Sequence, residues 1–346
     1  MVYLGHALSV DTTSPRWLQV LKHAAGFGVP LFFALSAYLI TELLMVEDRV
    51  AGSVNVRGFY CRRILRIWPL YFTVLIGGFF ISRLLPGEPI PLVALLSYVF
   101  LVGNWYTGLH GYLSTGLAPL WSIPIEEQFY LLWPLLLRYA TRRSLILICF
   151  LAWSCSQALV FIFCFHHALN NPTIWTDSIA QLQYFAIGAG MSLLLNGSLP
   201  KLRGSLRLAL VVSALLVFAM ADFVAYPRGM NSLDEHSSVA HTYPQYLFAS
   251  VTVALMLVAF LGYSSFGRWQ TLRYLGKISY GLYVYHIPAL LFLFKVEQRL
   301  GRGSPFVVAV LGIPMTVSFA WLSYEYLERP FMRMKEKFEV VKTREA

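Results

Sequence analysis

Apolar runs close in length to the thickness of a membrane recur along the whole of this 346-residue sequence. A helix needs roughly 20 predominantly apolar residues to cross about 30 Å of hydrocarbon. The composition agrees, because 58% of the residues are hydrophobic and only 13% are charged, whereas soluble domains carry about 25% charged residues. A soluble globular protein is therefore excluded, and the runs predict an all-α polytopic bundle of transmembrane helices in a lipid bilayer.

Proline, glycine and charged clusters delimit the runs and predict about ten spans. Residues 1–9 form an apolar stub that reaches only roughly 14 Å at 1.5 Å per residue, so we expect an incomplete first span and a chain that begins inside its first helix. Residues 91–106 are at the lower limit of length for a span. The other spans are expected at residues 25–46, 64–82, 120–140, 144–166, 179–196, 207–223, 245–263, 278–297 and 305–326.

The basic residues orient these spans. If residues 91–106 do not cross, twenty of the 27 Lys and Arg residues fall on one side, and such an excess marks the cytoplasmic side. We therefore expect both termini in the cytoplasm, a location in the inner (plasma) membrane, and a re-entrant or interfacial segment 91–106 on the extracytoplasmic side. Residues 327–346 should form a short basic cytoplasmic tail. The net charge of +10 then belongs to the loops, and no nucleic-acid partner is expected.

No metal site and no disulfide framework are predicted. CxxC spacing is the usual sign of a metal or redox site, and the four cysteines do not show it. The polar loop 222–244 contains Asp234, Glu235, His236 and His241, but these residues lack helical spacing and are more simply solvated than ligands of a metal.

Basic residues gather where a cytoplasmic loop enters a helix, in residues 59–69. Arg63 and Arg66 are i, i+3 neighbours on one face of that helix, and Arg62 adjoins them. Two guanidinium groups on one face can hold a phosphate through charge-assisted hydrogen bonds. The alternative is that these residues only anchor the helix at the membrane surface.

Two adjacent carboxylates, Glu126 and Glu127, occupy the opening turns of an otherwise apolar span. Carboxylates within a membrane are costly and are candidate functional groups. Because consecutive residues of a helix point about 100° apart, only one of the two can face a given pocket. Its companion would face another helix or cap a backbone group, and a structural role for either carboxylate is also open.

Two histidines stand at chemically useful positions. His6 ends the apolar stub, where an imidazole can act as a general base near neutral pH or serve as a polar interface residue. His286 lies in the middle of a span, and Tyr280, Tyr283 and His286 follow one another at i, i+3 and i+6. This polar strip would line a substrate channel or bond one helix to another.

Taken in order, these motifs resemble the acyltransferase-3 family of integral membrane O-acyltransferases, which modify bacterial surface and secreted carbohydrates. The resemblance implies a single membrane acyltransferase domain over residues 1–346. It rests on His6, residues 28–36, an RxxR at Arg63 and Arg66, residues 121–130 that are similar to WSLxxExxxY, residues 275–288 and residues 326–331.

The resemblance implies transfer of an acetyl or other short acyl group from cytoplasmic acyl-CoA to a hydroxyl of an extracytoplasmic glycan, such as O-antigen or exopolysaccharide. Acyl-CoA is then a substrate, and no permanently bound cofactor is expected. The implied site residues are His6 and Glu126 for catalysis, Arg62, Arg63 and Arg66 for binding the donor, and Trp121, Tyr130, Tyr283 and His286 for the lining of a substrate channel.

Two mechanisms and one rival function are open at this point. In the first mechanism His6 deprotonates the acceptor hydroxyl while Glu126 orients or charges the imidazole. The second is a covalent acyl-enzyme relay, for which Ser36 is the candidate nucleophile, although helix packing is the simpler role for Ser36. The rival is a transporter or flippase, which would predict inverted repeats that the sequence does not show.

Overall fold

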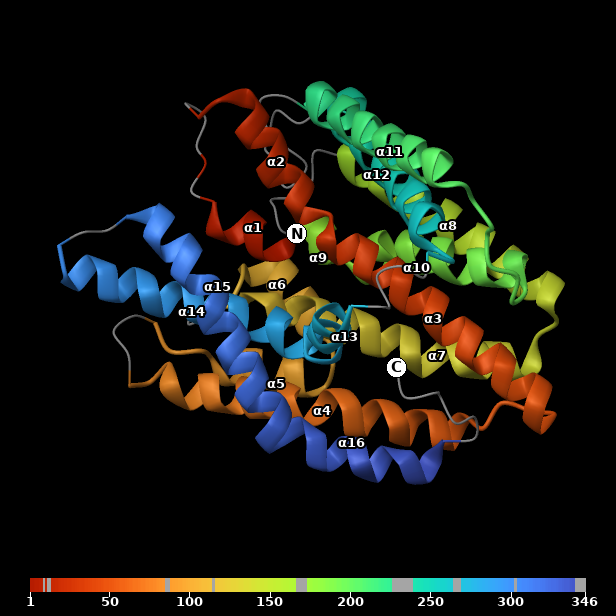
Figure 1. Cartoon of the computed structure of the whole chain (residues 1–346), viewed down its shortest axis with the longest axis horizontal. Helices are drawn as coiled ribbons and strands as arrows, with labels where there is room; N and C mark the ends of the chain where they lie inside the picture. The colour runs from red at the N-terminus through yellow and green to blue at the C-terminus, as the bar shows by residue number, and fades with distance from the viewer. Residues whose placement is uncertain are drawn as a thin grey trace.

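The computed structural model describes residues 1–8, 10, 14–84, 88–113, 116–165, 173–225, 239–263, 269–301 and 304–339, without the side chains of 23, 221–225 and 239–242. All regular structure in these ranges is helical (Figure 1), so the predicted all-α class is confirmed for the described chain. Of the acidic and histidine residues of loop 222–244, residues 234–236 and the side chain of 241 lie outside the description.

Within the described residues, seven segments are long and apolar enough to cross a membrane, and each overlaps a predicted span. The prediction of about ten spans is supported only to this coarser extent. Helix α1 (Val2–Ala7) has six residues, α7 (Ser122–Tyr139) is not one of the seven, and the apolar part of α11 is the shorter Gly204–Met220. The seven segments are Arg16–Ala51, Val56–Ile81, Arg142–Phe165, Ser178–Leu195, Tyr243–Phe260, Ser279–Arg299 and Pro305–Phe338.

Helices α8 to α13 form the part of the bundle that follows α7 in the sequence. On one side α8 packs against α10 and α12, and α11 packs against α12 (Figure 1). Large apolar side chains such as Phe80, Phe150 and Phe306 are more than half exposed on the outside, as expected for surfaces that face lipid. The bounds are α8 Arg142–Phe165, α9 Thr173–Thr176, α10 Ser178–Leu195, α11 Gly204–Ala225, α12 Val239–Phe260 and α13 Gln270–Lys277.

Residues 16–26 form helix α2 (Arg16–Gly26), whereas the predicted spans leave residues 10–24 outside any helix. Val20 and Ala24 of α2 pack against the core, while Trp17 is exposed. Along α2 the apolar residues Trp17, Val20 and Leu21 lie on one face and the polar residues Gln19 and Lys22 lie on the opposite face, which is why the average over a window hides the helix. Helix α2 continues through Phe27 into α3 (Gly28–Ala51).

The stretch 91–106 contains two short helices, α5 (Leu92–Val99) and α6 (Gly103–His110). Leu101 between them has a φ of 60°, a left-handed conformation that breaks a helix. Eight residues per helix are too few to cross a bilayer. The stretch therefore does not cross as one helix, in agreement with the prediction.

The C-terminal segment lies along α4 (Val56–Ile81), as Figure 1 shows for α16. Helices α14 (Ser279–Arg299) and α15 (Pro305–Ser323) pack against each other, and a π-helical turn, η3 (Tyr324–Glu328), leads into α16 (Arg329–Lys335) and η4 (Glu336–Phe338). The part of the predicted tail up to residue 338 is thus packed on the bundle, and residues 340–346 lie outside the description.

Helices α3 and α10 approach each other most closely at Gly188. A Cβ atom at Gly188 would lie 1.9 Å from the carbonyl oxygen of Ala34. We expect Gly188→Ala to force the two backbones apart and to lower the free energy of unfolding by about 1–3 kcal/mol, as measured by unfolding in detergent. Gly77→Ala is the matched control, because nothing lies within 4 Å of a Cβ there; equal stability of the two variants would contradict the close packing.

Candidate functional site

Two histidines far apart in the sequence meet in the structure. Helix α1 places His6 so that its Nδ1 lies 3.2 Å from Nε2 of His286 on α14, and the ring centroids are 5.0 Å apart. Nδ1 of His286 contacts the carbonyl oxygen of Tyr283, and Nδ1 of His6 lies 3.0 Å from the carbonyl oxygen of Val2. Each imidazole therefore uses Nδ1 toward a backbone carbonyl.

These contacts fix the tautomers of the neutral rings. A carbonyl oxygen only accepts, so His286 carries its proton on Nδ1 and donates it to Tyr283. Its Nε2 is then an acceptor, and Nδ1–H of His6 is shared between that nitrogen and the Val2 carbonyl. Nε2 of His6 is left with a free lone pair, which makes it the candidate base.

His6 lines a cavity of about 420 Å³, together with Lys22, Tyr112, Trp121, Trp175 and Tyr283 among others. Lys22 places a cation in the same cavity. A neutral imidazole at this position can accept a proton. Two of the predicted channel residues, Trp121 and Tyr283, share this cavity.

Glu126 lies deeper in the bundle and makes its contacts away from His6. Its Oε1 accepts hydrogen bonds from Oγ of Ser36, at 2.7 Å, and from Oη of Tyr130; the two hydroxyl oxygens are 2.6 Å apart. Within the described residues no hydrogen bond joins Glu126 to His6. The group that touches His6 is His286, so the orienting role expected for Glu126 is not reflected in these contacts.

A polar face of α7 connects the two regions. Ser122, Glu126 and Tyr130 follow at i, i+4 and i+8, so they share one face over about 12 Å of helix. At one end Ser122 Oγ lies 2.7 Å from Oη of Tyr283, which also donates to the carbonyl of Pro119 at 2.8 Å. A line of polar side chains thus runs from the histidine pair to Glu126.

Glu127 turns to the other side of α7, as expected for consecutive residues. Its Oε2 accepts a hydrogen bond from Nε1 of Trp68 at 3.0 Å, and its Oε1 is buried without a partner. Glu126 and Glu127 therefore face different helices, α3 and α4.

Arg63 and Arg66 lie at the opposite end of this line from His6. The Arg63 guanidinium is 5.3 Å from the centre of the Tyr130 ring, and its Nε is buried without a hydrogen-bond partner. Both arginines are within electrostatic range of Glu126. Neither forms a hydrogen bond or ion pair with another described residue, which leaves both guanidinium groups available to an anion.

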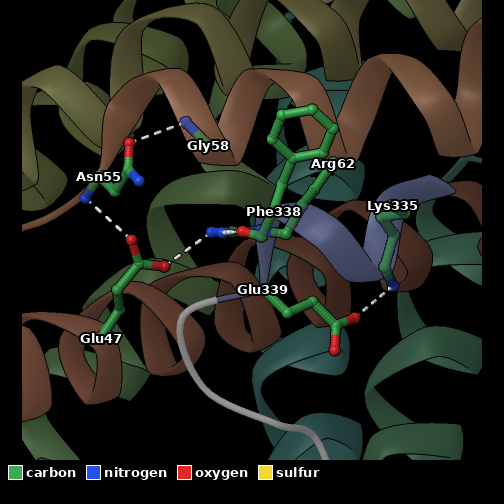
Figure 2. Close-up of polar contacts among 7 residues, drawn as sticks. All are labelled: Glu47, Asn55, Gly58, Arg62, Lys335, Phe338 and Glu339. Atoms are coloured by element: carbon green, nitrogen blue, oxygen red, sulfur yellow. Dashed lines mark hydrogen bonds and ion pairs between the residues drawn. The ribbon is translucent and has the colours of Figure 1, made fainter.

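Arg62 has a different environment from its neighbours (Figure 2). Its Nη2 pairs with Oε2 of Glu47 at 2.7 Å, and its Nη1 donates to the carbonyl of Phe338 at 2.6 Å. Both side chains of the ion pair are at least 93% buried. The predicted role of Arg62 in binding the donor is therefore not favoured, because its guanidinium already has protein partners.

With this geometry in place, comparison with known proteins identifies the family. The sequence model of the family described as "Acyltransferase domain" matches residues 1–325. The chain belongs to this acyltransferase-3 family. The resemblance inferred from the motifs is thus confirmed.

Relatives agree with this assignment. The chain is 29% identical over 329 residues to a Bacillus subtilis protein named "Putative peptidoglycan O-acetyltransferase YrhL", covering 88% of this chain and 50% of the relative. It is 25% identical over 336 residues to O-acetyltransferase OatA of Staphylococcus aureus, covering 92% and 54%. The chain therefore spans about half the length of these curated relatives. No solved structure matches it.

Sequence reasoning missed several residues of the site, among them Ser122 and Lys22. Ser122 could have been found, because it precedes Glu126 by four residues and so shares its helix face. Nothing in the sequence pairs Lys22 with His6, since only the packing of α1 against α2 brings them to one cavity.

The contrast between adjacent arginines gives a stability test. Arg62→Gln leaves the buried Glu47 carboxylate without its cation, and breaking a buried pair in this way costs about 3–5 kcal/mol. Arg63→Gln removes no hydrogen bond and should cost much less. Unfolding of both variants in detergent checks this; a larger loss for Arg63→Gln would contradict the assignment.

Proposed function

We propose that this protein is a membrane O-acyltransferase that passes an acetyl or other short acyl group from acyl-CoA, bound at Arg63 and Arg66, to a carbohydrate hydroxyl at His6. The observation that carries the proposal is that the arginines and His6 lie at opposite ends of the α7 polar face. At one end of the α7 polar face lie the guanidinium groups of Arg63 and Arg66, which form no hydrogen bond or ion pair with another described residue, and Nε of Arg63 is buried. At the other end lies an imidazole whose Nε2 has no hydrogen-bond partner in the described part of the chain. Family membership supports the reaction type.

In this proposal the distribution of Lys and Arg decides which end of the bundle faces the cytoplasm. The excess of Lys and Arg in the segments on the Arg63 side supports a cytoplasmic position for that end, where acyl-CoA is found. The C-terminal segment, which is held against α4 beside Arg63 and Arg66, then lies on the cytoplasmic side of a multi-pass inner-membrane protein. The pantetheine arm of the donor extends along α7, past Tyr130 and Glu126, toward the cavity of His6.

The proposed reaction is a direct transfer. Nε2 of His6 takes the proton of the acceptor hydroxyl as its oxygen attacks the thioester carbonyl, and the new C–O bond forms. The C–S bond then breaks, and the imidazolium returns the proton to the departing CoA thiolate. Lys22 lines the same cavity and supplies a cation near the oxyanion that develops on the carbonyl oxygen.

The acceptor class comes from the relatives. One relative carries peptidoglycan in its printed name, and both are named as O-acetyltransferases. A hydroxyl of an envelope glycan is the acceptor chemistry that fits these names. The tryptophans of the cavity, Trp121 and Trp175, offer apolar faces against which a sugar ring can stack.

The first test is transfer from labelled acetyl-CoA into envelope carbohydrate by membranes that contain this chain. We expect His6→Ala to lower transfer by about 10²–10⁴-fold, the usual contribution of a general base. His110→Ala is the control, because this histidine contacts Tyr106 and does not line the cavity. Acetyl-CoA that is not consumed by the unmutated chain, while a solute crosses the membrane, would instead favour a transporter.

The tautomer assignment gives a second, finer test. His286→Ala removes the acceptor for Nδ1–H of His6, so it should lower kcat for acetyl transfer by less than His6→Ala does. It should leave the KM for acetyl-CoA unchanged, because the donor phosphates are bound at the other end of the α7 polar face. Steady-state kinetics of the two variants decide this; an effect on KM alone would show that His286 does not act through His6.

A further inference from the structure

The segment α16–η4 is fixed to the start of α4 by a chain of hydrogen bonds (Figure 2). Arg62 holds the Phe338 carbonyl at 2.6 Å and Glu47 at 2.7 Å. Glu47 also accepts from the backbone N–H of Asn55 at 2.8 Å, and the Asn55 side chain caps α4 by accepting from Gly58 N–H at 2.9 Å. These contacts place η4 beside the same turns of α4 that carry Arg63 and Arg66.

This anchoring brings a third cation to the arginine end. Lys335 lies one helical turn before Phe338, its side chain is only 20% exposed, and it is within electrostatic range of both Arg63 and Arg66. Three cations close together repel one another unless an anion lies among them. Glu339 contacts Lys335 directly, with its Oε1 3.3 Å from Nζ, whereas Glu126 and Glu328 act on Arg66 only through electrostatics.

We propose that Lys335 binds a phosphate group of the acyl-CoA donor together with Arg63 and Arg66, and that Glu339 holds its ammonium until the donor arrives. This inference rests on the proposed function and adds to it. In this view Arg62 is a positioning residue, because it fixes the segment that carries Lys335 and does not itself contact the donor.

The chemistry of Lys335 and Glu339 supports the replacement of the carboxylate by a donor phosphate. The 3.3 Å distance between Lys335 and Glu339 is longer than the 2.7–2.9 Å usual for a charge-assisted hydrogen bond, so an incoming phosphate can displace Glu339. The donor carries both a pyrophosphate and a separate phosphate monoester, more negative charge than two guanidinium groups neutralise. The unpartnered Nε of Arg63 and the ammonium of Lys335 together offer a phosphate donors from two sides.

The test uses the purified full chain with acetyl-CoA as the varied substrate. We expect Lys335→Gln to raise the KM for acetyl-CoA about tenfold, the loss expected for one hydrogen bond to a charged group, with little change in kcat. Lys337→Gln is the matched control, since this lysine is exposed on η4 and should leave KM unchanged. Lys335→Arg should restore most of the affinity, and Glu339→Gln should lower KM.

A measurement of CoA binding without an acceptor distinguishes a failure of the role of Lys335 from a failure of the proposed function. Calorimetry should give a weaker Kd for Lys335→Gln than for Lys337→Gln, with unfolding in detergent unchanged. If the unmutated chain transfers acetyl groups and the two lysine variants have equal KM and Kd, the role of Lys335 is overturned and the proposed function stands. If the unmutated chain neither binds CoA nor transfers acetyl groups, the proposed function itself fails.

Discussion

The structure depends on one constraint: a polar group inside a lipid-embedded bundle must find its partner within the protein. Helix α7 meets it between Ser122 and Tyr130, except at Oε1 of Glu127, which has no partner among the described residues. Ser122 is bonded to Tyr283, Glu126 to Ser36 and Tyr130, and Glu127 to Trp68. Four helices, α3, α4, α7 and α14, are thereby tied together by side chains that would be costly in lipid. The same hydrogen bonds hold the polar face in a fixed shape, so the residues that stabilise the bundle are also those that would line the proposed route of the donor.

Against this background, the groups that stay unpartnered are informative. Nearly all buried polar atoms in proteins are hydrogen-bonded, and each exception calls for an explanation. Arg62 and Arg63 are adjacent, yet one guanidinium has two protein partners while the other has a buried Nε with none. Ordinary anchoring of the helix at the membrane surface explains Arg62. It does not explain why Arg63 and Arg66 stay open beside a third cation, whereas an anionic ligand does.

The sequence predicted the helices because their signal is local. Seven runs contain enough apolar residues to be identified without knowledge of their neighbours, whereas α2 was missed because its polar face lowers the average over a window. The site was predicted in part. The RxxR spacing placed Arg63 and Arg66 on one face, but the partners of Glu126 and His6 depend on which helices are adjacent. His6 and His286 are 280 residues apart, and no local pattern pairs them.

The separation of His6 from Glu126 changes the chemistry expected of each. A carboxylate beside His6 would stabilise its imidazolium form strongly and slow the return of the proton. The neutral His286 orients the His6 ring but stabilises its positive charge only a little. In the proposed reaction the charge on His6 is therefore brief, and the nearby Lys22 cation disfavours it further. In the proposed reaction Glu126, with Ser36 and Tyr130, lies instead between the arginines that bind the donor and the histidine that acts as base. A carboxylate that accepts from two hydroxyls keeps these side chains in fixed positions, so its proposed part is to guide the thioester to His6.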